Sequence, residues 1–358
     1  MNMLFTQLDD YLTKCVKARK IPGCVCWVGN LSTSFFFEEY GHAQITPKKT
    51  VMKKETVFDL ASLTKPIATA LSIMILHEKK NLNIDQPIGE VLPSLSATGS
   101  RGSTIRQLLA HTSGLQPWYP TYLFPEETRM ESIAGLNTGK EDTIYSCLGY
   151  IILGKIIERV GKEPIDRFFS STVTASLGSH TLGFGPVKDQ LTVAATEKGN
   201  RHELKMSKTH GPSNKIKWRK KVIQGEVHDG NAYYAYEGKA GNAGLFSNVL
   251  DLITFTRAYL SGEIIAPETL SLMLRDHTAG AEKRNLGWRL DPYPGLLSPL
   301  SFGHTGFTGT MVCVDPETNL IIIMLANAIH PKVKLGLMQP IREEAVRIIS
   351  TILKRRRQ

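Results

Sequence analysis

The strand-like segments of this chain gather near its two ends, and a mostly helical stretch lies between them. Each such segment is a short run rich in apolar, β-branched or aromatic residues, bounded by turn-forming residues. Strands from both ends must pair to bury their apolar faces, so the pattern predicts one sheet built from both chain ends, with flanking helices. The predicted strands are residues 23–28, 33–40, 57–60, 302–304, 310–314 and 320–326.

Apolar residues spaced three and four apart predict the helices. With 358 residues, the chain is long enough for one large domain or two modest ones. We expect a single domain, in which residues 1–84 and 242–358 form a sheet-containing lobe and residues 85–241 form a helical lobe. The predicted helices are residues 4–16, 66–76, 104–110, 150–160, 250–260, 267–274 and 339–353.

Composition excludes several classes of protein. No apolar run reaches the roughly 18 residues that a membrane span requires. The first apolar residues are interrupted by charged ones at helical spacing, which favours an amphipathic helix over a secretion signal. The five cysteines are odd in number and lack the spacing of a zinc site. Cys24 and Cys26 lie on one face of a predicted strand, where a core position is expected. Reduced thiols in a cytoplasmic protein are the simplest account.

The formal net charge of +10 comes from two segments. Residues 198–221 hold nine Lys or Arg against a single acid, Glu203, and residues 354–357 add four more basic residues. The remainder of the chain is close to neutral. A solvated basic loop and tail are favoured over a nucleic-acid or polyanion contact, because the single Trp218 does not make the aromatic platform that single-strand binding requires.

Ser62 and Lys65 place a hydroxyl and an amine one helical turn apart at the start of an apolar helix. Pro66 fixes this start, because proline has no N–H and is tolerated only in the first turn. The free N–H groups and positive dipole at a helix entrance favour an alkoxide and an oxyanion, and we expect them to lower the proton affinity of Lys65. A neutral Lys65 would then take the proton of Ser62 and activate it as a nucleophile.

Chance alone supplies about one Ser-x-x-Lys in a chain of this length. Two further segments strengthen the catalytic interpretation. Tyr145 precedes a predicted helix, where a tyrosine beside a lysine can share general acid–base work, although a structural tyrosine is an alternative. His304-Thr305-Gly306 lies at a predicted strand, where Gly306 allows a ligand to approach the backbone closely; a histidine satisfied within a tight turn is the alternative.

Four motifs in this order and rough spacing, over residues 20–330, resemble the serine β-lactamase and penicillin-binding-protein superfamily. The closest resemblance is to its class C β-lactamase-like branch, which also contains esterases and D-amino-acid peptidases. The resemblance implies an α/β fold of the α+β type, in which helices flank an antiparallel sheet and a mostly helical region is inserted. The motifs are Phe58-Asp59-Leu60-Ala61-Ser62-Leu63-Thr64-Lys65, His111-Thr112-Ser113-Gly114-Leu115, Tyr145-Ser146-Cys147-Leu148-Gly149-Tyr150 and Gly303-His304-Thr305-Gly306.

The resemblance also implies roles. Ser62 would be the acylated nucleophile, Lys65 the general base, and Tyr145 the group that passes the proton to the leaving group. His304, where the family usually has lysine, would orient Tyr145 and the substrate, as in esterase-like members. The backbone N–H groups of Ser62 and Phe307 would form the oxyanion hole. Substrate contacts are expected at Cys147, Thr305, Gly306 and His228.

Cys147 departs from the family pattern, because it stands where an asparagine normally binds the acyl-amide group of the substrate and contacts the lysine. A thiol is a weak hydrogen-bonding group, so an ester or an unusual amide is the expected substrate class. His228 and Asp229 lie in a segment that also resembles a bacterial subset of the family. Two alternatives remain for them, a role at the rim of the cleft and a place in a purely structural loop.

The predicted function is therefore a serine hydrolase that acts on a small-molecule or short-peptide ester or amide, with no metal or organic cofactor. One alternative is a D,D-carboxypeptidase or β-lactamase that acts on cell-wall material. A second alternative is a catalytically inactive binding protein of the same fold, whose basic segment at 198–221 contacts a polyanion. Added salt would weaken such electrostatic binding steeply and would leave esterase turnover unchanged.

Overall fold

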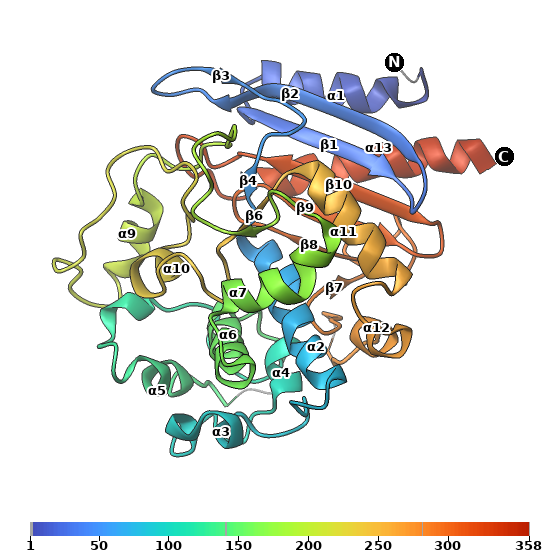
Figure 1. The fold of residues 1–358 in the computed structure, drawn as a ribbon. Helices are drawn as coiled ribbons and strands as arrows, with labels where there is room; N and C mark the ends of the chain where they lie inside the picture. The colour runs from blue at the N-terminus through green and yellow to red at the C-terminus, as the bar shows by residue number, and fades with distance from the viewer. Residues whose placement is uncertain (1–2, 140–141, 281, 358) are drawn as a thin grey trace.

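The computed structural model describes residues 3–139, 142–280 and 282–357. Its main sheet contains β1 (Gly23–Gly29), β2 (Ser34–Gln44), β3 (Thr50–Val51), β7 (Arg289–Leu290), β8 (Phe302–Thr305), β9 (Met311–Asp315) and β10 (Leu320–Ala326). These strands are antiparallel neighbours in the order β3-β2-β1-β10-β9-β8-β7 (Figure 1). Cys24 of β1 pairs with Ala326 of β10 at the middle of the sheet. The prediction of one sheet built from both chain ends is confirmed.

Helices cover both faces of this sheet. Helices α1 (Thr6–Lys17) and α13 (Met338–Arg357) lie together on one face, and α11 (Val249–Ser261) packs on the other (Figure 1). Side chains of β1 alternate between the two cores: Cys24 and Cys26 pack with α1 and α13, whereas Val25 and Trp27 pack with α11. The core position predicted for both cysteines is confirmed.

The stretch between the two sheet-forming ends is mostly helical. Its longest helix, α6 (Cys147–Gly161), begins three residues earlier than the sequence predicts, which places Cys147 in its first turn. None of the described helices is both long and apolar enough to cross a membrane. The other helices of this stretch are α3 (Ile88–Val91), α4 (Ile105–Leu109), α5 (Arg129–Ala134), α7 (Ile165–Phe169), α8 (Ala175–Leu177), α9 (Arg201–Ser207) and α10 (Gly230–Ala235).

A small second sheet leads into the segment that carries Ser62. Its strands β4 (Phe58–Asp59), β5 (Gly183–Phe184) and β6 (Leu245–Ser247) run in the order β4-β6-β5. After β4 the chain forms a 3₁₀ turn over Ala61–Leu63, a π-helical segment over Lys65–Ala70, and then α2 (Leu71–Glu78).

The helix predicted to begin at Pro66 is thus present, but its first turns are not α-helical. Pro66 lies in its first turn, where the missing N–H costs no helical hydrogen bond. The last helix of the described residues before β7 is α12 (Pro267–Leu274), which agrees with the predicted bounds.

Candidate active site

Ser62 and Lys65 are in direct contact at the entrance of this helical segment. Lys65 Nζ donates a hydrogen bond to Ser62 Oγ at 2.9 Å and a second one to the carbonyl oxygen of Asn242 at 3.0 Å. The Lys65 side chain is fully buried, whereas Ser62 is partly exposed. A nucleophilic hydroxyl at the surface of a cleft and an amine behind it are therefore set in hydrogen-bonding distance.

Packing against residues 241–242 holds Lys65 in place. Thr69, one turn after Lys65, donates its hydroxyl to the carbonyl oxygen of Gly241 at 2.6 Å. A Cβ at Gly241 would collide with the backbone of α6, so only glycine lets this segment lie between the π-helical turn and α6. The acceptor for Lys65 thus comes from a segment 177 residues away in the sequence.

The lysine pKa differs from the sequence-based expectation. Burial by itself lowers the pKa of Lys65, but coupling to the ionised forms of Cys147 and Tyr145 and to the Asp229 carboxylate outweighs burial and raises the pKa above its ordinary value. The expected lowering of the lysine pKa by the helix entrance is therefore wrong. Both hydrogen bonds of Lys65 Nζ go to oxygen acceptors.

Tyr145 lies against this lysine, immediately before α6. Lys65 Nζ lies 5.1 Å from the centre of the Tyr145 ring. Burial raises the pKa of Tyr145, and the charge of Lys65 together with hydrogen bonding to Ser62 and Lys65 offsets only part of that increase. Ser146 caps α6 by accepting the N–H of Gly149 at 3.1 Å, which fixes where the helix begins. The phenol, the amine and the hydroxyl thus form one cluster.

His304 contacts the same tyrosine from strand β8. Its ring centre lies 5.7 Å from that of Tyr145, and its Nδ1 donates to the carbonyl oxygen of Thr305 at 2.9 Å, because a carbonyl can only accept. Burial and the charges of Arg284 and Lys65 hold the pKa of His304 well below its ordinary value. His304 is therefore neutral, with the lone pair on Nε2.

The turn between β8 and β9 is fastened to the residues just before Ser62. Thr308 Oγ1 donates to the carbonyl oxygen of Asp59 at 2.7 Å, and Thr310 Oγ1 donates to that of Leu60 at 3.0 Å. A Cβ on Gly306 would overlap both Thr310 Oγ1 and the Leu60 carbonyl. Gly306 thus lets the β8–β9 turn approach the Leu60 carbonyl closely. This approach brings the backbone of Phe307 alongside the Ser62 turn.

The residue before Ser62 is held in a left-handed conformation. Ala61 has φ +47°, which is uncommon for a residue other than glycine. Buried Asp59 accepts the Ala61 N–H at 2.8 Å on one oxygen and the His228 N–H at 2.7 Å on the other. Asp59 therefore stabilises a strained backbone turn at the nucleophile and joins it to the His228 loop.

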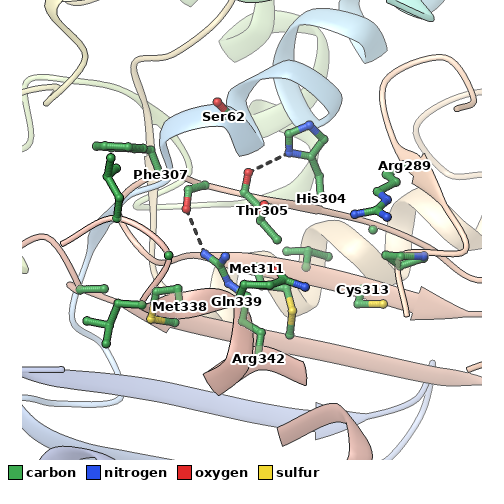
Figure 2. A pocket seen from close by; sticks show the side chains of 18 of the residues that line it. Ser62, Arg289, His304, Thr305, Phe307, Met311, Cys313, Met338, Gln339 and Arg342 are labelled. Carbon is green, nitrogen blue, oxygen red and sulfur yellow. Dashed lines mark hydrogen bonds between the residues drawn. The ribbon is translucent and has the colours of Figure 1, made fainter. Parts of the chain in front are cut away.

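A cavity of about 460 Å³ opens beside Ser62. Figure 2 shows Ser62 on one side of the β8 backbone and Arg342 on the other. Arg342 donates to the carbonyl oxygens of Gly306 and Thr310 at 3.0 Å each, and burial lowers its pKa to about 10. The described residues that line the cavity include no Asp or Glu. Its cationic lining residues are Arg284, Arg289, Lys334 and Arg342.

The cavity brings together most of the residues singled out in the sequence. Its lining includes Ser62, Tyr145, His304, Thr305, Gly306 and Phe307. Lys65 lies behind Ser62, and Cys147 interacts with Lys65 but is not among the described lining residues.

His228 lies beside Phe307 and is likewise not among the described lining residues of the cavity. Its Nε2 pairs with Glu197 at 3.1 Å, and its ring is stacked on Phe307 with the centres 5.8 Å apart. His202 of α9, within the basic segment, is stacked on the same ring at 5.6 Å. The two histidines therefore support the ring of the residue whose N–H is expected in the oxyanion hole.

Arg284 is a site residue that sequence reasoning missed. It is 6% exposed, its guanidinium carbon lies 5.0 Å from the centre of the Tyr145 ring, and it pairs with Glu282. An isolated arginine in a loop gives no signal in one sequence. Asn242 was missed for a similar reason, since its backbone carbonyl, not its side chain, makes the contact with Lys65.

Comparisons with known proteins agree with this geometry. The Beta-lactamase family model matches residues 8–345. A protein of Escherichia coli K12 named "Putative D-alanyl-D-alanine carboxypeptidase" is 30% identical over 318 residues, which cover 78% of this chain and 70% of that protein. The protein of the same name from Salmonella typhimurium LT2 is also 30% identical, over 78% of this chain and 71% of that protein.

Solved structures share the fold at low sequence identity. EstCE1, described as a hydrolase with promiscuous acyltransferase activity, has a TM-score of 0.74 at 19% identity and covers 98% of both chains. A class C β-lactamase has a TM-score of 0.74 at 19% identity, over 97% of this chain and 98% of that one. Unliganded simvastatin synthase from Aspergillus terreus has a TM-score of 0.73 at 17% identity, over 99% of both chains. The expected α+β fold is confirmed, and the chain belongs to the β-lactamase family of serine hydrolases.

Proposed function

We infer that the protein hydrolyses an ester or a D-amino-acid amide through an acyl-enzyme on Ser62. The observation that carries this proposal is the 2.9 Å hydrogen bond between Lys65 Nζ and Ser62 Oγ, next to Tyr145 and at the mouth of a cavity. A nucleophilic hydroxyl that is hydrogen-bonded to the amine of an acid–base pair, in a cleft, is the arrangement that covalent catalysis requires.

Acylation requires the basic form of the Lys65–Tyr145 pair, in which one of the two coupled groups has lost its proton. The basic member of the pair then takes the Ser62 hydroxyl proton while Oγ attacks the substrate carbonyl. The N–H groups of Ser62 and Phe307 stabilise the oxyanion, and Lys65–Tyr145 returns the proton to the leaving group. Water, activated by the same pair, hydrolyses the ester on Ser62 and restores the free enzyme.

A negatively charged substrate suits the cavity. Four cations line it, and none of the described lining residues is acidic, so a carboxylate on the substrate would be attracted electrostatically. The weak hydrogen-bonding capacity of the Cys147 thiol favours an ester over an ordinary amide. D-alanyl-D-alanine peptides are the second candidate substrate, because relatives 30% identical to this chain carry the carboxypeptidase name.

The nucleophile is tested by incubating the wild-type protein and Ser62→Ala with a fluorophosphonate probe, followed by intact-mass analysis. We expect one adduct on the wild-type protein, none on Ser62→Ala, and a loss of chromogenic ester turnover by orders of magnitude in the variant. Equal labelling and turnover in both proteins would exclude Ser62.

The substrate class is tested with paired nitrophenyl esters whose acyl chains differ by a carboxylate. We expect a higher kcat/KM for the anionic ester, and a smaller preference at high salt. A catalytically inactive binding protein would turn over neither ester, whereas cleavage of a D-alanyl-D-alanine peptide faster than either ester would favour the carboxypeptidase.

A further inference from the structure

His111 binds the backbone on both sides of Tyr145. Its carbonyl oxygen accepts the N–H of Ile144 at 2.9 Å, and its ring Nδ1 accepts the N–H of Ser146 at 3.0 Å. Tyr145 is the residue between these two. One residue therefore holds the N–H of the residue before the tyrosine and the N–H of the residue after it, and with them the direction in which the phenol leaves the backbone.

The His111 ring also supports the tyrosine ring. Its centre lies 4.6 Å from that of Tyr145 and 5.0 Å from that of Tyr150. Tyr150 is itself fixed, because its hydroxyl donates to the carbonyl oxygen of Leu109 at 2.9 Å. The Tyr145 ring thus packs on the His111 ring, and the His111 ring packs on the anchored ring of Tyr150. Tyr145 cannot move away from the cleft without breaking these contacts.

The bonding pattern excludes proton transfer by His111. Nδ1 accepts a backbone N–H, so the proton of the neutral ring is on Nε2. Nε2 is buried and has no hydrogen-bond partner among the described residues, and His111 does not occur among the described residues that line the cavity. Burial and the charges of Arg284 and Lys65 hold the pKa of His111 well below its ordinary value, so the ring stays neutral.

We propose that His111 is the positioning residue of Tyr145, and that it sets the placement of the phenol against Ser62 and Lys65 without touching the substrate. This inference rests on the proposed function, since it concerns the acid–base group assigned there. The contacts come from a residue 35 positions before Ser146, on the loop after α4.

The backbone of His111 guides the choice of variants. Its φ is +62°, a left-handed conformation that asparagine also adopts readily and leucine does not. Asparagine Oδ1 branches from the same atom as histidine Nδ1, so His111→Asn keeps the acceptor for the Ser146 N–H and loses the ring. His111→Leu keeps apolar volume and loses the acceptor.

We expect His111→Leu to lower kcat roughly 10²-fold, the usual cost of a catalytic group displaced by about 1 Å, with KM changed less than threefold. The kcat of His111→Asn should be at least tenfold higher than that of His111→Leu. In His111→Leu the rise of kcat/KM with pH should move to higher pH, because Tyr145 moves away from the charge of Lys65. A purely structural role would not shift this profile.

Lys162 supplies the matched control, because it too is left-handed, with φ +59°, at the far end of α6. Lys162→Leu carries the same backbone penalty and should keep normal kcat. If Lys162→Leu and His111→Leu lose kcat equally at equal thermal stability, or if His111→Asn is as impaired as His111→Leu, the inference is overturned.

The same His111 substitution, made in a Tyr145→Phe variant, separates this inference from the proposed function. With Tyr145 replaced by Phe, adding His111→Leu should slow fluorophosphonate labelling of Ser62 by no more than about twofold, because the group being positioned is already gone. Full activity in Tyr145→Phe would refute the acid–base role of Tyr145 and the inference with it. Full activity in His111→Leu beside an impaired Tyr145→Phe would refute the inference alone.

Discussion

Gly306 provides the sharpest test of how the oxyanion hole is built. A Cβ at this position would overlap the carbonyl oxygen of Leu60 and the hydroxyl of Thr310. The hydroxyl cannot turn away freely, since it donates to the same Leu60 carbonyl at 3.0 Å, and the carbonyl belongs to the backbone just before Ser62. Gly306→Ala therefore forces the β8–β9 turn and the Ser62 turn apart.

Two magnitudes follow from this displacement. Inserting a methyl group into a packed site costs about 1–3 kcal/mol of unfolding free energy. A shift of about 0.5 Å is enough to misplace a catalytic donor, and the loss of one oxyanion donor lowers kcat by about 10²–10³. We therefore expect Gly306→Ala to fold with moderately reduced stability and to lose kcat far beyond what that reduction explains.

The assay is steady-state hydrolysis of a chromogenic ester, together with urea unfolding of each protein. Gly183→Ala is the matched control, because a Cβ at Gly183 meets no atom within 4 Å, and it should match the wild type in both measurements. A Gly306→Ala variant with kcat within threefold of wild type would refute the claim that contact with Leu60 sets the position of the Phe307 N–H.

Two further predictions concern the acid–base pair and its neighbour. The pKa values of Lys65 and Tyr145 are both raised, so the basic form of the pair is scarce at neutral pH and kcat/KM should still be rising above neutral pH. A plateau of kcat/KM at or below pH 7 would contradict this charge assignment. Cys147→Asn should raise the ratio of amide to ester turnover about fivefold, since one added hydrogen bond contributes about 1 kcal/mol. Cys147→Ser is the control, and an unchanged ratio in a peptide-versus-ester assay would refute the role given to this position.

Local patterns predicted the elements that carry the site. The strand that carries His304 lies where the sequence places it, and the helix after Ser62 is present although it begins with a π-helical segment. The turn that carries Tyr145 also precedes a helix, which begins three residues earlier than predicted. The resemblance of four motifs then gave the fold, which the sheet order confirms.

Contacts between distant segments could not be predicted in this way. Three contacts of the site join residues far apart in sequence. They are the hydrogen bond from Lys65 to the Asn242 carbonyl, the contact of the Arg284 guanidinium with the Tyr145 ring, and the hydrogen bond from the His228 N–H to Asp59. The direction of the Lys65 pKa shift was predicted wrongly for the same reason. The helix entrance is visible in the sequence, whereas the coupling of Lys65 to Cys147, Tyr145 and Asp229 depends on the tertiary structure.

The charge state of the pair also bears on which bond the enzyme breaks more easily. A base of high pKa is scarce at neutral pH but strong when present, and its conjugate acid is a weak donor to the leaving group. A phenolate or alkoxide leaves an ester without needing full protonation, whereas an amine must be protonated before it leaves an amide. We therefore expect the Lys65–Tyr145 pair to favour ester over amide cleavage, which is also the preference expected from the weak hydrogen bonding of the Cys147 thiol.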